Sequence, residues 1–100
     1  MNRLAPYNSV ITELCRIYKV KSLYAFGSVL TDKFTATSDI DLVVDFSTIA
    51  VEDYADNYFD FKFSLQDVFN RPVDLLEEKA IKNPYLRTSI NQQRQLLYGQ

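Results

Sequence analysis

The spacing of apolar residues near the start of the chain is typical of a helix with one buried face. Between residues 10 and 18, apolar side chains return after three or four positions. The helix is expected to begin after Pro6, with Asn8 or Ser9 as its N-cap, and to end near Lys19.

Two further segments show helical spacing. Residues 51–69 form a long amphipathic pattern, and Asn70 directly after them is able to stop a helix. Asn83 followed by Pro84 is a typical helix start, because proline fits the first helical position. This last helix is expected to be closed by Gly99, and its buried face would contain Leu86, Ile90, Gln93 and Leu97.

Three short segments predict strands. Residues 22–26 are largely apolar and stop at Gly27, and residues 40–46 alternate apolar and polar side chains, which marks a strand with one face on the core. Residues 73–76 form a third apolar run, and Pro72 before it disfavours a central position. The order is helix, strand, strand, helix, strand, helix, so the expected class is α/β or α+β, with helices packed on a small sheet.

The composition indicates one globular domain and excludes several kinds of site. In 100 residues, 47% are hydrophobic and the formal net charge is −2, which argues against nucleic acid as a partner. The absence of histidine excludes imidazole-activated nucleophiles and histidine metal ligands, and a lone cysteine, Cys15, excludes an internal disulfide. No segment has the pattern of a signal peptide or membrane span, so a cytoplasmic protein without a membrane partner is expected.

Aspartates in the later strands form a candidate metal site. Asp39 and Asp41 are two apart on a strand, so both leave the same face, roughly 6.6 Å apart along the chain. Carboxylates are the hard oxygen ligands that magnesium accepts, although any half-solvated strand also shows this alternation. Asp45 lies too far along the strand to join them. Asp74 is a better third ligand, because a carboxylate within an apolar run needs a partner, a metal or a strand edge.

A glycine-serine pair stands where the first strand ends. Gly27 allows the backbone to approach a phosphate closely, and the Ser28 hydroxyl adds a hydrogen-bond donor. Such a pair alone most often marks an ordinary turn.

Three segments together resemble one enzyme superfamily. They are residues 23–28 (LYAFGS), 38–44 (SDIDLVV) and 72–75 (PVDL), followed by a closing LYG at 97–99. Their order and spacing resemble the nucleotidyltransferase superfamily related to the polymerase beta palm, and within it the minimal nucleotidyltransferase (MNT) domains. The resemblance covers nearly all of residues 1–100 and implies a single domain with a mixed sheet flanked by helices.

The resemblance also implies an activity. It implies a Mg²⁺-dependent nucleotidyltransferase that moves a nucleoside monophosphate to a hydroxyl group. AMP, donated by ATP, is the expected nucleotide. The implied roles are nucleotide binding by Gly27, Ser28 and Ser38, binding of two magnesium ions by Asp39, Asp41 and Asp74, and activation of the acceptor hydroxyl by Asp74.

One position departs from the family pattern. Many members carry an arginine soon after the glycine-serine pair, where this chain has Val29, Leu30 and Thr31. Lys33 in the same loop could supply the missing charge to the nucleotide, although a solvated loop lysine is the simpler interpretation. The departure leaves open a second hypothesis, a partner-binding module that neutralises its partner by contact alone.

The short length predicts that the acceptor comes from elsewhere, because larger relatives hold it with an additional domain. MNT proteins resembling this one commonly act beside a HEPN-domain, ribonuclease-like toxin, and some transfer AMP to a tyrosine of that partner. An antitoxin acting on a HEPN partner is therefore the leading hypothesis, and transfer to a small molecule ranks last.

Two phenylalanines on the long helix predict an interface. A step of about 100° per residue places Phe59 and Phe63 opposite the buried stripe of that helix. They are expected to contact a HEPN partner or a second copy of the chain, the alternative being a helix that is buried on both sides.

Overall fold

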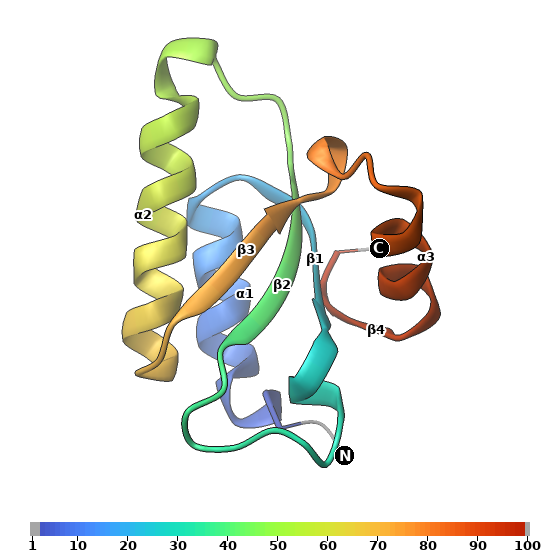
Figure 1. The fold of residues 1–100 in the computed structure, drawn as a ribbon. Helices are drawn as coiled ribbons and strands as arrows, with labels where there is room; N and C mark the ends of the chain where they lie inside the picture. Colours follow the sequence, from blue (N-terminus) through green and yellow to red (C-terminus); the bar gives the residue numbers. More distant parts are fainter. Residues whose placement is uncertain (1–2, 100) are drawn as a thin grey trace.

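The computed structural model describes residues 3–99 of the chain, and a four-stranded sheet with the order β3-β2-β1-β4 lies at its centre (Figure 1). The strands are β1 (Val20–Phe26), β2 (Ile40–Phe46), β3 (Val73–Glu77) and β4 (Arg94–Tyr98). β1 pairs antiparallel with both β2 and β4, whereas β2 and β3 run parallel. The sheet is mixed, which confirms the expected fold class.

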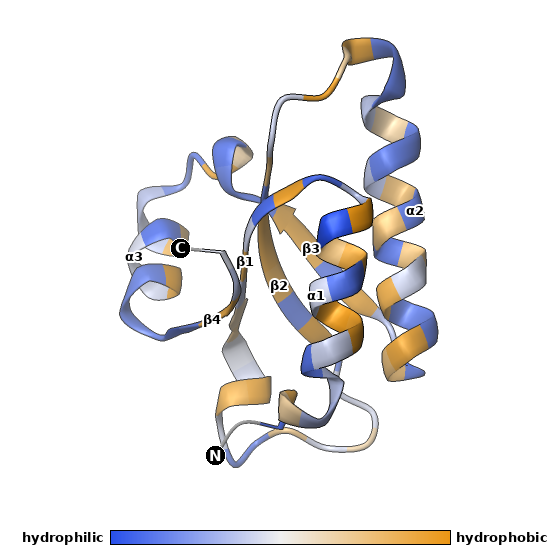
Figure 2. Cartoon of the chain, turned by 180° about the vertical axis from the view of Figure 1, so that it is seen from behind, coloured by the Kyte–Doolittle hydropathy of each residue, from blue (hydrophilic) through white to orange (hydrophobic). Residues whose placement is uncertain are grey.

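Two helices pack side by side on one face of this sheet. They are α1 (Asn8–Ile17) and α2 (Val51–Phe69), and α3 (Pro84–Gln92) lies apart from them, near β4 (Figures 1 and 2). A hydrogen bond of 3.3 Å between the hydroxyls of Tyr18 and Ser64 links the end of α1 to α2. Single turns of 3-10 helix cover Ala5–Tyr7, Gly27–Leu30 and Glu78–Ala80.

Alternate strand residues separate the two faces of the sheet. Leu23 and Ala25 of β1, like Leu42 and Val44 of β2, are buried in the main core. The residues between them point to the opposite side, because side chains alternate along a strand. This opposite side, which we call the outer face, carries Tyr24, Phe26, Asp41, Asp74 and Arg94.

Several predicted element ends are confirmed. α2 and β2 have the bounds that the sequence predicts, and Asn70, in the left-handed conformation with φ 54°, follows the end of α2. At the start of α3, the Asn83 side chain accepts hydrogen bonds from the backbone N–H groups of Tyr85 and Leu86. Within residues 3–99, no helix is both long and apolar enough to cross a membrane.

The predicted extent of the last helix is wrong. α3 ends at Gln92, and residues 94–98 form β4, so one more strand follows the predicted order of elements. Pairing with β1 satisfies backbone groups that a free strand edge would leave open, while Leu97 still packs against the core. The partner strand is far away in the sequence, so the local spacing of apolar residues does not reveal this pairing.

The predicted start of the first helix also needs correction. Asn8 is the first residue of α1, and no side chain caps the helix. The 3-10 turn over Ala5–Tyr7 runs directly into α1, and the backbone N–H of Asn8 donates to the Ala5 carbonyl, which replaces a cap. The helix ends at Ile17 rather than near Lys19, and β1 begins earlier than predicted, at Val20.

Candidate functional site

Gly27 brings the turn after β1 directly against a carboxylate of β2. Its φ is +75°, a conformation that favours glycine, and a Cβ atom placed on it would lie 2.5 Å from Oδ2 of Asp41. Any larger side chain would therefore displace the carboxylate or the turn. The hydroxyl of Ser28, the next residue, makes no hydrogen bond within the described part of the chain and is free to donate.

The strand register places two aspartates side by side. Asp41 of β2 is the direct partner of Asp74 of β3, and in a parallel pair such partners leave the same face. Asp39 stands just before β2, two residues from Asp41. β3 is an edge strand and Asp74 is exposed, so its carboxylate avoids the burial penalty that the apolar run suggested.

The three carboxylates interact electrostatically. The pKa of Asp41 is raised above its ordinary value, first because burial disfavours the charged form and then because Asp74 and Asp39 repel that charge. The site therefore has an excess of negative charge that a cation would relieve.

The donor set fits a divalent metal such as Mg²⁺, which takes oxygen ligands. Within residues 3–99, however, no group of three or more Asp, Glu or Cys side chains lies close enough together to hold a metal ion as placed. The lack of a side chain at Gly27 allows the Asp41 carboxylate to lie directly against the turn.

The loop that carries Asp39 is held by Arg71, to which the sequence pattern assigns no role. Arg71 donates from Nη1 to the carbonyls of Thr35 at 3.0 Å and Ser38 at 2.8 Å, and its guanidinium lies 4.4 Å from the centre of the Phe34 ring. The hydroxyl of Ser38 accepts a hydrogen bond of 2.9 Å from the backbone N–H of Thr35. Ser38 therefore shapes the loop through its hydroxyl.

Lys33 is exposed in this loop and forms no ion pair within residues 3–99. Its backbone N–H donates to the Thr31 hydroxyl at 3.1 Å. Val29, in the turn after Ser28, is buried, and its carbonyl accepts a hydrogen bond of 3.0 Å from Arg3.

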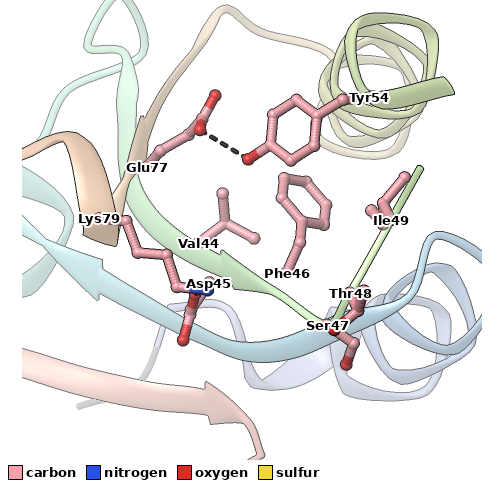
Figure 3. A pocket seen from close by; sticks show the side chains of 9 residues that line it. All are labelled: Val44, Asp45, Phe46, Ser47, Thr48, Ile49, Tyr54, Glu77 and Lys79. Atoms are coloured by element: carbon pink, nitrogen blue, oxygen red, sulfur yellow. Dashed lines mark hydrogen bonds and ion pairs between the residues drawn. The ribbon is translucent and has the colours of Figure 1, made fainter. Parts of the chain in front are cut away.

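A cavity of about 280 Å³ lies where β2 ends and α2 begins, and its lining includes Asp45 but none of the other three aspartates (Figure 3). Tyr54 donates a hydrogen bond of 2.6 Å to Glu77 at this cavity, and Lys79 pairs with Asp45 at 3.5 Å. Asp45 thus has its own cation and stays separate from the other three aspartates, as its position along the strand predicts.

Phe59 and Phe63 project from α2 into solvent. They are 48% and 53% exposed, and their rings stack with centres 6.0 Å apart. The alternative of a helix buried on both sides is therefore wrong. Phe61 and Leu65, on the other side of α2, are fully buried.

Comparisons with known proteins identify the family of the chain. The family model described as "Nucleotidyltransferase domain" matches residues 8–97. Two relatives come from Methanocaldococcus jannaschii. "Putative protein adenylyltransferase MJ0128" is 41% identical over 75 residues, which is 75% of this chain and 74% of the relative. "Putative protein adenylyltransferase MJ0126" is 36% identical over 87 residues, 80% of this chain and 79% of the relative.

Solved structures share the fold. "Structure of putative minimal nucleotidyltransferase" has a TM-score of 0.75 and 23% identity, over 92% of this chain and 90% of that one. A chain of the complex between a tri-AMPylated Shewanella oneidensis HEPN toxin and an MNT antitoxin has a TM-score of 0.66 and 22% identity, over 100% of this chain and 74% of that one. The family match spans the glycine turn and all three aspartates, and the chain therefore belongs to the nucleotidyltransferase domain family.

Proposed function

We propose that this nucleotidyltransferase moves AMP from ATP to a tyrosine hydroxyl of a HEPN-domain toxin and acts as its antitoxin. The observation that carries the proposal is the placement of Asp41 beside Asp74 and against Gly27. The adenylyltransferase names of the relatives from Methanocaldococcus jannaschii support AMP as the transferred group. The Shewanella complex, in which an MNT antitoxin accompanies an AMPylated HEPN toxin, supports the acceptor.

The carboxylates of Asp39, Asp41 and Asp74 would hold two magnesium ions. When bound, these ions supply positive charge that offsets the negative charge developing on the α-phosphate. The Ser28 hydroxyl and the backbone at Gly27 donate to the triphosphate, as turn N–H groups do for anions.

The reaction is an in-line displacement at the α-phosphorus. The acceptor oxygen bonds to phosphorus as the bond to the bridging oxygen breaks, and pyrophosphate leaves. The hydroxyl proton passes to the carboxylate of Asp74, which is exposed and able to meet an acceptor from another protein. The chain's own residues therefore position the reactants and accept one proton.

The partner surface is the exposed face of α2 around Phe59 and Phe63. This helix carries five acids and one lysine, a net charge of 5 − 1 = 4 negative units. Two copies meeting through this face would bring like charges together, so the surface favours a partner with basic side chains over self-association. The acids of α2 are Glu52, Asp53, Asp56, Asp60 and Asp67.

Incubation with ATP labelled at the α-phosphate tests the proposal. With Mg²⁺ and a HEPN-domain protein from the same organism, label should appear on the HEPN protein, and EDTA should remove the transfer. Inhibition of the toxin without any label would contradict the enzyme and support the contact-only hypothesis, which the lack of a cation at Val29, Leu30 and Thr31 favours.

Replacing Phe59 and Phe63 together by serine should weaken HEPN binding by about tenfold or more, because exposed aromatic residues often dominate interface energies. Binding is measured by calorimetry. Tyr85→Ser is the matched control, since Tyr85 is 85% exposed on α3, away from α2. Unchanged affinity in the double variant would show that the partner binds elsewhere, and light scattering on wild type and variant would detect any self-association through the same face.

A further inference from the structure

Arg94 lies in the same cross-strand row as the aspartates. Phe26 of β1 pairs with Arg94 of β4 on one side and with Asp41 of β2 on the other, and Asp41 pairs in turn with Asp74. Direct partners share a face, so all four side chains leave the outer face. Arg94 and Asp41 lie on strands separated by β1, so their backbones are two strand spacings apart, about 10 Å.

The guanidinium of Arg94 is held in place while its donors stay free. Its central carbon lies 4.0 Å from the centre of the Tyr24 ring, a cation–π contact that restrains the guanidinium. Its nearest carboxylate oxygen, Oε1 of Glu78, is 4.0 Å away, beyond hydrogen-bond distance. Within residues 3–99, the side chain of Arg94 donates no hydrogen bond, although it is only 30% exposed.

Neighbouring cations of the outer face are already engaged. Arg87 donates to the Glu78 carboxylate at 2.5 Å and to the Glu78 carbonyl at 2.8 Å, and Lys79 pairs with Asp45. Glu78 is therefore shared by two arginines, which leaves this group with a formal surplus of 2 − 1 = 1 positive charge. Arg94 is the more weakly held of the two arginines, because its ion pair with Glu78 spans 4.0 Å and its side chain makes no hydrogen bond within residues 3–99.

A triphosphate bound at the aspartates needs a positive side chain. The turn after Gly27 and Ser28 supplies none, because Val29, Leu30 and Thr31 follow. A guanidinium with free donors suits phosphate, since its planar fork bonds two oxygens at once.

We infer that Arg94 binds the β- or γ-phosphate of the nucleotide and that Tyr24 positions its guanidinium for that contact. The inference rests on the proposed function. The α-phosphate reacts at the aspartates, and Arg94 stands to one side of them in the same row, so it meets the part of the triphosphate that leaves as pyrophosphate.

Nucleotide affinity with Mg²⁺, measured by calorimetry for ATP and for AMP, tests this assignment. Arg94→Ala should weaken ATP binding by about tenfold or more, because a charge-assisted bond to phosphate is lost, and should leave AMP binding unchanged. Arg94→Lys should recover part of the loss. Tyr24→Leu should weaken ATP binding less than Arg94→Ala does, and Tyr24→Phe should not weaken it, since the ring is kept.

Arg16→Ala is the control for charge, because it removes one arginine from an exposed site on α1. Thermal melts of every variant establish that the fold is kept. Unchanged ATP affinity in Arg94→Ala, or an equal loss for ATP and AMP, would overturn the role of Arg94 while wild-type binding upholds the proposed function. A wild-type protein that binds no ATP would overturn both.

Discussion

Asp41→Asn should lower the rate of AMP transfer by at least about a thousandfold, because it removes one charged ligand from the centre of the acid group. Asp41 lies between the other parts of the site. Asp74 is its partner in the strand register, and Gly27 lies directly against its carboxylate. Asparagine has nearly the same shape, so the loss reports on charge. The measurement is the initial rate of transfer from labelled ATP to the HEPN protein.

Asp45→Asn is the matched control for that change. Asp45 belongs to the same strand and the same alternation as Asp41, but it pairs with Lys79. Its replacement should change the transfer rate by no more than a few-fold. Activity retained by Asp41→Asn, or lost equally in both variants, would remove Asp41 from the reaction.

Asp41→Asn should be more stable than the wild-type protein in EDTA at neutral pH. The pKa of Asp41 is raised in the folded protein, so the folded state binds a proton more tightly than the unfolded chain does. The contribution of Asp41 to the free energy of unfolding is present at low pH and is lost as the pH rises through the raised pKa. Asparagine carries no charge, and the gain in melting temperature should therefore shrink on acidification.

Much of the site follows from local sequence patterns. The period of two in residues 40–46 predicts both β2 and the shared face of Asp39 and Asp41, and a glycine before serine predicts the turn at Gly27. These features depend on residues near one another in the chain. Predicting that Asp41 and Asp74 lie side by side also required the resemblance to a known family. The register between two distant strands cannot be predicted from either strand alone.

Features that join distant segments were missed. β4 pairs with a strand from the first third of the chain, and the spacing of Ile90, Gln93 and Leu97 suits a helix equally well. The bonds of Arg71 to the loop before β2 and the contact of Arg94 with Tyr24 also depend on this tertiary packing. An arginine in a sequence gives no sign of which carbonyl or ring it will meet.

Two phenylalanines two positions apart on α2 should differ sharply in their effect on stability. Phe61 is fully buried, with its ring centre 5.8 Å from that of Tyr18 and 5.9 Å from that of Phe46, so it joins α1, α2 and β2. Phe61→Ala should lower the free energy of unfolding by about 3–5 kcal/mol, because it removes buried apolar surface and leaves a cavity. A loss of this size lowers the melting temperature of a domain of this length by at least about 12 °C.

Phe59→Ala removes the same atoms from the same helix and should cost less than about 1 kcal/mol, because Phe59 is 48% exposed. Urea unfolding of both variants measures the difference directly. Equal losses would mean that Phe59 is covered in the folded chain and would remove the partner surface proposed for α2. A large loss for Phe61 alone, combined with weaker HEPN binding for the Phe59 and Phe63 double variant, would separate the two faces of this helix, one stabilising the fold and the other serving recognition.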